Sequence, residues 1–373
     1  MSKGLLPVLP APSENNKGWP WQEETPVSVY NNKNEWPKIS IVTPSFNQGV
    51  FLEETLRSIL LQNYPNLELI VIDGGSKDVS VEIIEKYEPW ITYWVSEKDS
   101  GQSDAINKGF TKVTGEIITW LNSDDLFTPG ALHQAATYFS TIPTDTGLIH
   151  GGTILFKEEK VIKNDWAYHN PSLERYLAGM AFPQPSAFFL KKYFDKIGGQ
   201  VNEQLHYGMD YDLFCRLACV CKFVAVKDLF SRYRLHDSSK SVLAQDNFIG
   251  DWTRSFINLC KNVEWDDILK EMESTGLYDK NDLNWFQPFT FAADQQILLK
   301  ADKRKIFFYH YTYLFKAFYW SGQMNKAKQL LGILKSGFPA AWLNDEKAYL
   351  PMIKKLAMPG FVLRLLKKIK KVV

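Results

Sequence analysis

The sequence predicts an α/β protein with a Rossmann-type sheet, mixed but mainly parallel, that is flanked by helices and followed by a C-terminal helical appendage. Two observations support this fold class. In the first half of the chain, short apolar runs of strand length alternate with amphipathic runs of helix length, and each apolar run ends in glycine and short polar residues. Strands alternating with helices imply right-handed crossovers and a mainly parallel sheet. From about residue 248 onward the pattern is helical and lacks this punctuation.

The expected elements follow one another in a regular order. Strands are expected at 39–43, 67–72, 92–95 and 117–121, and the intervening helices at 51–62, up to 87, and at 103–112. Thr128 followed by Pro129 is typical of an N-cap and first helical turn, which predicts that strand 117–121 leads directly into a helix. Further on, short strands are expected at 148–152, 154–156 and 161–162, then a helix with a buried face at Leu213, Leu217 and Val220.

The pattern divides the chain into four parts. Residues 1–37 are rich in Pro, Asn and Glu and predict an extended N-terminal arm whose tryptophans lie against the main domain. Residues 38–245 form the predicted α/β domain, and 246–350 the helical appendage, in which 309–319 and 324–334 resemble one helical hairpin of a repeat. Residues 351–373 predict a basic amphipathic C-terminal helix.

Composition excludes several classes of protein. With 373 residues, 45% hydrophobic and 14% aromatic, the chain can bury a large core. Its net charge of +1 argues against a general nucleic-acid binder, since phosphate binding needs a basic excess. The four cysteines lack paired CxxC spacing, which argues against zinc and favours reduced core thiols.

Polar residues cluster where each predicted strand ends, at 43–47, 73–78, 99–104 and 123–125. The last cluster ends in Asp124 and Asp125, directly after a buried strand. Ligands of open α/β sheets bind at the carboxyl ends of strands, and paired carboxylates there suit Mg²⁺ or Mn²⁺ when a diphosphate completes the shell. A solvated acidic turn is the alternative for the pair taken alone.

A nucleotide would have to be held without the common fingerprints, because neither GxGxxG nor GxxxxGK[ST] occurs. The strand ends instead offer backbone amides and short polar side chains to a base and a ribose. Asp73 could accept a hydrogen bond from a pyrimidine imide. The candidate nucleotide-binding residues at these ends are Thr43, Pro44, Ser45, Asn47, Asp73 and Ser76.

Several motifs in residues 38–130 resemble those of the inverting family 2 glycosyltransferases with a GT-A fold: TPSFNQ, VIDGGSKD, EKDSGQSDAINKGF and WLNSDD occur in that order. Three later segments, QPSAFF, GMDYDLFCRL and YRLHDSSKS, are similar to the branch that builds bacterial cell-surface polysaccharides. The resemblance covers about residues 38–245. It implies a nucleotide-sugar donor and a divalent cofactor, Mn²⁺ or Mg²⁺.

The resemblance also implies roles for individual residues. Thr43, Asp73 and Asp104 would contact the nucleotide, and Asp124 the ribose. The ligands of the metal would be Asp125 and His236, and Asp210 would be the general base. The family often has a Glu-Asp pair at the base, whereas this chain has Met209 before Asp210, so only the second carboxylate is kept.

The chemistry of an inverting transfer is consistent with separate roles for the base and the metal ligands, and each residue also has an alternative role. An inverting displacement needs one carboxylate to take the acceptor proton and a cation to stabilise the departing diphosphate. Asp210 could instead cap its helix, with Asp212 as an equally plausible acid, and His236 could be bonded within its own turn. Arg234 and Ser239 are candidate phosphate contacts, and the loop around Gln184 a candidate acceptor contact.

We therefore expect transfer of a sugar from a UDP-linked donor to a hydroxyl of a glycan or lipid-linked acceptor, with inversion. Two other functions are compatible with the fold. A nucleotidyltransferase should carry a basic residue in the loop after its first strand, which TPSFNQG lacks. A non-catalytic nucleotide-sugar-binding scaffold would not need the acidic residues and the histidine of the candidate site.

The C-terminal segment predicts a membrane contact. Residues 351–373 contain seven basic and no acidic residues, and the apolar positions of 361–373 fall on one helical face. Such a helix is attracted to anionic lipid, although it could also dock on the core with a solvated basic face. With no secretory h-region and no apolar run long enough to span a bilayer, we expect a cytoplasmic protein, peripheral on the inner face of the membrane.

Overall fold

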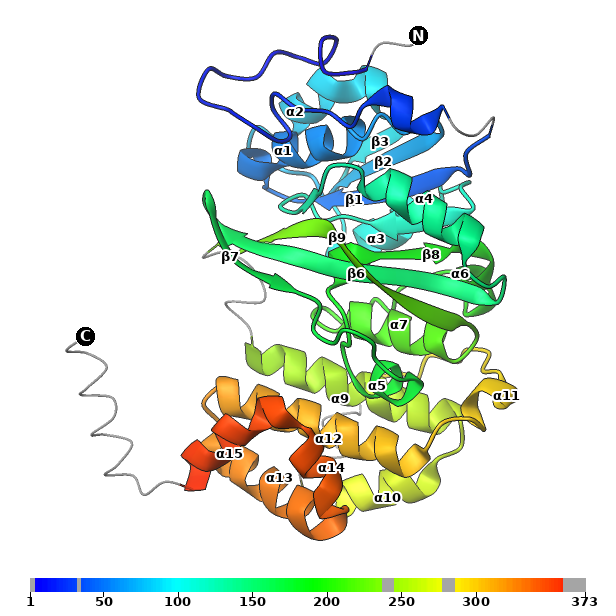
Figure 1. Cartoon of the computed structure of the whole chain (residues 1–373), viewed down its shortest axis with the longest axis vertical. Helices are drawn as coiled ribbons and strands as arrows, with labels where there is room; N and C mark the ends of the chain where they lie inside the picture. Colours follow the sequence, from blue (N-terminus) through cyan, green and yellow to red (C-terminus); the bar gives the residue numbers. More distant parts are fainter. Residues whose placement is uncertain (1–3, 32–34, 237–244, 277–285, 358–373) are drawn as a thin grey trace, which may run out of the picture.

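The computed structural model describes residues 4–31, 35–236, 245–276 and 286–357. Within these residues the strands form a nine-stranded mixed sheet in the order β3-β2-β1-β4-β8-β6-β9-β5, with β7 paired to β6. Helices flank the sheet, and a helical region follows it (Figure 1). The predicted α/β fold class is therefore confirmed.

The parallel part of the sheet comes first in the chain, as the sequence predicts. Residues Thr43 and Ser45 of β1 lie opposite Val71 and Asp73 of β2, which brings the carboxyl ends of these strands to one edge. The elements of this part are β1 (Ile39–Ser45), α1 (Gly49–Leu60), β2 (Leu67–Asp73), α2 (Ser80–Tyr87), η2 (Glu88–Trp90), β3 (Tyr93–Ser96), α3 (Gln102–Phe110) and β4 (Ile117–Trp120).

The second part of the sheet corrects two expectations. The predicted short strands 148–152 and 154–156 merge into one long strand, β6, which pairs in parallel with β9. Strand β4 is also not followed directly by a helix: β5 pairs with β9, and the next helix begins only at Ala131, with Gly130 as its N-cap. Thr128 instead donates its hydroxyl to Leu229 O. The elements here are β5 (Leu126–Phe127), α4 (Ala131–Thr141), β6 (Thr146–Lys157), β7 (Lys160–Asp165), α5 (Leu173–Ala178), η3 (Gln184–Ser186), β8 (Ala187–Leu190), α6 (Lys191–Lys196), α7 (Met209–Ala218) and β9 (Lys222–Arg234).

The N-terminal arm packs against α1. Trp19 is buried and donates its indole N–H to Phe127 O at 2.8 Å, as expected for a tryptophan lying against the main domain. Arg57 of α1 is fully buried and donates to the carbonyls of Pro10, Pro20 and Trp21. The arm also contains a short 3₁₀ helix, η1 (Val27–Tyr30).

The helical region packs on α5 and α7, on the side of the sheet that these helices cover (Figure 1). One hydrophobic cluster runs without interruption from Val42 and Trp120 of the sheet through Phe214 of α7 to Phe307 and Leu330 of the helical region. The predicted hairpin is α12 with α13. The helices are α9 (Gln245–Asn262), α10 (Asp266–Ser274), α11 (Gln295–Leu298), α12 (Lys303–Trp320), α13 (Met324–Gly337), α14 (Ala340–Asp345), η5 (Lys347–Tyr349) and α15 (Leu350–Ala357).

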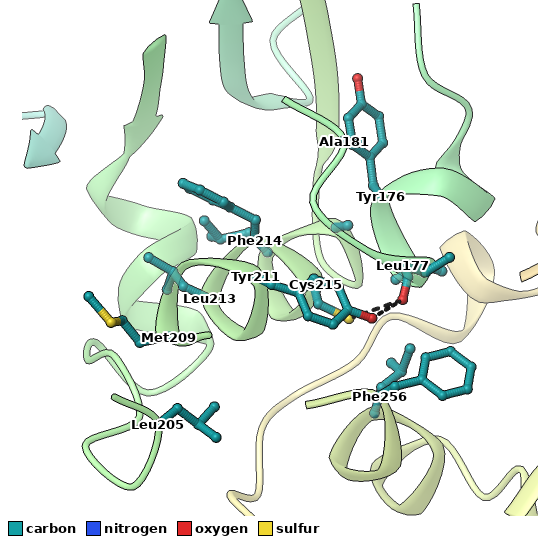
Figure 2. Close-up of a cluster of buried hydrophobic side chains, with 14 of the residues drawn as sticks. Tyr176, Leu177, Ala181, Leu205, Met209, Tyr211, Leu213, Phe214, Cys215 and Phe256 are labelled. Carbon is teal, nitrogen blue, oxygen red and sulfur yellow. Dashed lines mark hydrogen bonds between the residues drawn. The ribbon is translucent and has the colours of Figure 1, made fainter. Parts of the chain in front are cut away.

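Helix α7 lies at the centre of this shared core. Its Tyr211 ring points toward α5, where the hydroxyl donates to Leu177 O at 2.8 Å, and Phe256 of α9 lies on the same side (Figure 2). The four cysteines are buried free thiols, as predicted. None of the helices in the described ranges is both long and apolar enough to cross a membrane. Of the predicted C-terminal amphipathic helix, 351–373, residues 351–357 belong to α15, whereas 358–373 and Ser239 lie outside the described residues.

Candidate active site

Two hydroxyl groups at the end of β1 are buried without partners. Thr43 and Ser45 occupy alternate positions of the strand, so both side chains lie on the same face. Within the described part of the chain, neither Thr43 Oγ1 nor Ser45 Oγ forms a hydrogen bond, although both are shielded from solvent. Because buried polar groups are normally paired, these two hydroxyls are suited to meet a polar ligand at this edge.

The loops after β1 and β2 are tied together by side chains. Asp73 is fully buried, and its carboxylate accepts from the N–H groups of Gly75 and Ser76 and from the hydroxyls of Ser76 and Ser96. Ser76 Oγ in turn accepts from Asn47 N–H at 2.7 Å. Asn47 has a left-handed φ of 52°, a conformation that asparagine tolerates better than most residues. In this structure the Asp73 carboxylate therefore holds the loop after β2 through these hydrogen bonds. Its contact with the pyrimidine of a nucleotide stays a prediction.

Asp125 is held by the end of strand β9. Its Oδ1 accepts from Arg234 N–H at 3.0 Å, and its backbone carbonyl accepts from Thr55 Oγ1 of α1. Its Oδ2 is buried and forms no hydrogen bond within the described ranges. Burial, and then the neighbouring carboxylate of Asp124, raise the pKa of Asp125 well above its usual value. The group is thus short of positive charge, which a bound cation would supply.

His236 reaches the same place from the far end of β9. Its Nε2 lies 2.9 Å from Asp124 Oδ2, and its ring packs on Phe51, with ring centres 4.8 Å apart. The imidazole thus contacts Asp124 rather than Asp125. Among the described residues, no three His, Cys, Asp or Glu side chains converge as a preformed metal site.

The residues present nevertheless fit a divalent cation. Asp125 Oδ2 has no protein partner in the described chain, and Asp124 and His236 offer an oxygen and a nitrogen at the same strand ends. Mg²⁺ and Mn²⁺ are often held by one or two carboxylates, with substrate phosphates completing the shell. The diphosphate of a nucleotide sugar would complete the coordination shell of a cation held by these side chains.

Arg234 is anchored rather than projecting from the surface. Its Nε donates to Asp124 O at 3.0 Å and its Nη2 to Glu54 of α1. The guanidinium also lies over the rings of Phe51 and Phe156. These contacts fix the turn that carries the two aspartates.

Gln184 lies beside the aspartate turn, and Asp104 lies at the β3 edge of the sheet. Gln184 Nε2 donates to Trp120 O, the last residue of β4, at 3.0 Å. Asp104, in the first turn of α3, accepts from Ser100 N–H and lines a polar cavity of about 450 Å³ at the β3 edge. None of the other predicted site residues lines this cavity.

Asp210 and Asp212 differ sharply in their surroundings. Asp212 is buried and paired with Arg216, with Oδ2 2.8 Å from Nε, so it is part of the core. Asp210 is partly exposed, and its Oδ1 accepts from Tyr211 N–H at 2.8 Å. Desolvation raises the pKa of Asp210 to about 6, and the charge of Asp251 adds to the rise. Of the two carboxylates, Asp210 is the one that is partly exposed and has no ion-pair partner among the described residues.

The loop that leads into α7 is held from two sides. On one side, Asn107 of α3 exchanges two hydrogen bonds with the backbone of Val201, and Ser103 Oγ donates to Leu205 O. On the other side, Asp251 of α9 accepts from the N–H groups of Tyr207 and Gly208. Because α3 begins with Gln102, whose amide donates to Asn122, this loop is fixed relative to the aspartate turn.

Several residues near the predicted groups are marked by no sequence motif. Glu54 and Phe51 lie on α1 and contact Arg234, which is about 180 residues further along the chain. Asp251 and Tyr313 come from the helical region, where no motif marked them. In the sequence, Asp251 is a single carboxylate within an aromatic helical segment, and this pattern does not indicate a functional residue.

The mixed sheet and its flanking helices define a GT-A-like fold, and similar solved structures share this fold. The mannosyltransferase PcManGT from Pyrobaculum calidifontis, solved with GDP-Man and Mn²⁺, is 17% identical with a TM-score of 0.53, covering 88% of this chain and 82% of that one. TarS from S. aureus, solved with UDP-GlcNAc, is 17% identical with a TM-score of 0.50, covering 75% and 81%. At this identity the likeness concerns the fold alone.

Sequence comparison gives the family. The model of glycosyl transferase family 2 matches residues 40–197. An uncharacterised glycosyltransferase of Mycobacterium tuberculosis is 33% identical over 196 residues, covering 51% of this chain and 72% of the relative. A second, from Rickettsia typhi, is 24% identical over 297 residues, covering 76% and 91%. The chain therefore belongs to glycosyl transferase family 2, as its motifs indicate, and is a glycosyltransferase.

Proposed function

We propose that this glycosyltransferase moves a sugar from a nucleoside diphosphate donor, with UDP as the expected nucleotide, to a hydroxyl of a glycan or lipid-linked acceptor, with inversion. The observation that supports this best is the state of Asp210. It is a partly exposed carboxylate with a pKa of about 6, on a different element from the strand-end pair Asp124 and Asp125. One acidic group is thus available for the acceptor while others serve the donor.

In the proposed reaction Asp210 accepts the proton of the acceptor hydroxyl as the oxygen attacks the anomeric carbon and the bond to the diphosphate breaks. A pKa of about 6 suits this role, because the carboxylate is ionised at neutral pH and is a stronger base than an ordinary aspartate. The hydrogen bond from Tyr211 N–H to Oδ1 fixes the carboxylate orientation.

The donor side rests on the β1 and β4 ends. Thr43, Pro44, Ser45 and Asn47, with Asp73 and Ser76 behind them, line the proposed nucleotide site, Asp124 faces the ribose, and Asp104 and Arg234 are further candidate contacts. Asp125 and His236 would hold Mn²⁺ or Mg²⁺. When bound, the cation supplies positive charge that stabilises the leaving diphosphate.

The chemistry can be tested with a donor panel of UDP, GDP and dTDP sugars, with Mn²⁺ and with EDTA. We expect EDTA to abolish transfer and Asp125→Asn to lower it about a hundredfold. Asp195→Asn, an exposed carboxylate of α6 paired with Lys191, serves as the control and should leave the rate unchanged. Metal-independent transfer by both wild type and Asp125→Asn would exclude the metal role. NMR of the product gives the anomeric configuration, and retention would exclude the inverting mechanism.

We place the protein in the cytoplasm, peripheral on the inner face of the membrane, with a role in polysaccharide biosynthesis. The support is the charge of residues 351–373, with seven basic residues and no acidic ones. Flotation with vesicles containing anionic lipid should recover the full chain and lose a chain ending at Pro359. Equal recovery of the two would exclude the C-terminal helix as the contact.

A further inference from the structure

Four aromatic side chains form a continuous surface that runs from the loop before α7 into the helical region. The ring centres are 5.3 Å apart for Tyr207 and Phe248, 5.5 Å for Phe248 and Trp252, and 4.6 Å for Trp252 and Tyr313. All four side chains are partly exposed. Tyr207 belongs to the loop before α7, Phe248 and Trp252 to α9, and Tyr313 to α12. We call this set the aromatic wall.

Both ends of the aromatic wall lie beside Asp210. At one end, Tyr207 lies in the loop that leads into α7 and precedes Asp210 by three residues. At the other end, burial and then the charge of Asp210 raise the pKa of the Tyr313 hydroxyl, an electrostatic effect that requires the two groups to be near one another. The wall therefore adjoins the carboxylate proposed to receive the acceptor proton.

Two glycines allow the helices to approach this closely. A Cβ atom at Gly208 would lie 2.8 Å from Asp251 Cβ and 3.4 Å from Trp252 Cδ1. One at Gly179 would lie 2.8 Å from the ring of Tyr313. A side chain at Gly208 would push α9 away from the loop before α7, and one at Gly179 would push α12 away from the end of α5. The position of the wall therefore depends on glycine at both places.

The wall combines flat apolar faces with polar groups. Trp252 Nε1 is shielded from solvent and has no hydrogen-bond partner within the described part of the chain. A pyranose ring is complementary to such a surface, because its C–H face packs on an aromatic ring while its hydroxyls can accept from an indole N–H. A lipid tail would use the apolar faces but leave that donor unpaired.

We propose that α9 and α12 build the acceptor subsite of this enzyme, and that the aromatic wall of Tyr207, Phe248, Trp252 and Tyr313 binds a sugar ring of the acceptor next to Asp210. The proposal rests on the proposed function. It assigns the acceptor class as a saccharide whose sugar, rather than its lipid, is recognised, and it makes the helical region part of the active site.

The test uses the full chain and saturation-transfer NMR with four probes: methyl glycosides of glucose, galactose, mannose and N-acetylglucosamine, with and without UDP and Mn²⁺. Dodecyl phosphate represents a lipid chain. We expect at least one glycoside to bind wild type, and Trp252→Ala and Tyr313→Ala to weaken it about tenfold. Trp252→Phe, which keeps an aromatic face, should recover part of the affinity.

Trp320→Ala is the matched control, since Trp320 lies on the same helix α12 but is 63% exposed and outside the wall. It should bind glycosides like wild type. Thermal unfolding and donor binding should stay unchanged in all variants, which separates a lost subsite from a lost fold.

Three results would overturn the proposal: no glycoside binds wild type, binding survives both alanine variants, or dodecyl phosphate binds the wall in place of sugars. The readout is separate from that of the proposed function. If wild type neither binds nor consumes a nucleotide sugar, the proposed function fails, whereas glycoside binding without donor still reports on the wall.

Discussion

The strand-end edge with Asp125 and the loop with Asp210 are supported in different ways. At the edge, parallel strands close in sequence place their ends side by side, and loop hydrogen bonds such as Asn47 to Ser76 connect neighbouring motifs. The loop before α7 is instead held by α3 on one side and by α9 on the other, with about 94 and 44 residues of chain between the contacting groups. The loops after β1 and β2 are a product of local sheet topology, whereas Asp125 is held by the end of β9, and the loop before Asp210 by α3 and by α9 of the helical region.

This difference predicts which substitutions affect the nucleotide edge and which affect the surroundings of Asp210. The base side shares one hydrophobic core with the helical region, from Val42 to Leu330, so the helices support α7 directly. A change in the helical region can alter acceptor binding without reaching the nucleotide edge. Donor binding and acceptor chemistry should therefore separate in variants.

The largest effect is expected from Asp210→Asn. Removing the proposed base while keeping its shape should lower transfer about 1,000-fold, because proton transfer by a positioned side chain contributes on this scale. Donor binding by calorimetry should stay at the wild-type value, since Asp210 lies outside the strand-end edge. A rate within a few-fold of wild type would show that another group takes the acceptor proton.

The neighbouring Asp212→Asn should act on stability. Its side chain and that of Arg216 are 2% and 1% exposed, so removing one charge leaves the other buried and unpaired. We expect a loss of about 3 kcal/mol in the free energy of unfolding, measured by urea denaturation. Asp210→Asn, whose partner is a backbone N–H, should lose far less. Equal destabilisation by the two variants would remove the contrast between a core carboxylate and a catalytic one.

The smallest effect is a shift in pH dependence. With the pKa of Asp210 raised to about 6 by desolvation and by Asp251, the base is protonated below that value, and kcat/KM should rise as pH increases through 6. Asp251→Asn keeps an acceptor for the N–H groups of Tyr207 and Gly208 but removes a charge. The acidic limb should then move to lower pH by roughly half a unit. A limb that stays in place would limit Asp251 to a structural role.

The same raised pKa has a consequence for stability. Because the folded pKa of Asp210 lies above its ordinary value of 3.8, the native state binds the proton more tightly than the unfolded state. Its contribution to stability is therefore full below about pH 4 and is lost as pH rises through 6. Asp210→Asn should lack this component of the pH dependence of the urea midpoint.

The sequence by itself determined the parallel half of the fold, the family and the positions of the strand-end motifs. These features depend on periodicity and on short motifs, so the strand ending at Trp120 and the acidic turn after it could be located from nearby residues alone. It also singled out Asp210, although it left Asp212 as an equal alternative. The burial of Asp212 against Arg216 distinguished the two, and burial is a property of packing.

Only the tertiary structure decided which distant segments meet at the site. Pairing of β5 with β9 brings His236 to Asp124 and the backbone of Arg234 to Asp125, and it replaces the helix start predicted at Thr128. Packing of α9 on α7, and of α12 on α5 and α9, brings Asp251 and Tyr313 close to Asp210, the proposed base. Such contacts join residues about 40 to 110 positions apart, and no local pattern encodes them because they arise when separate apolar faces share one core.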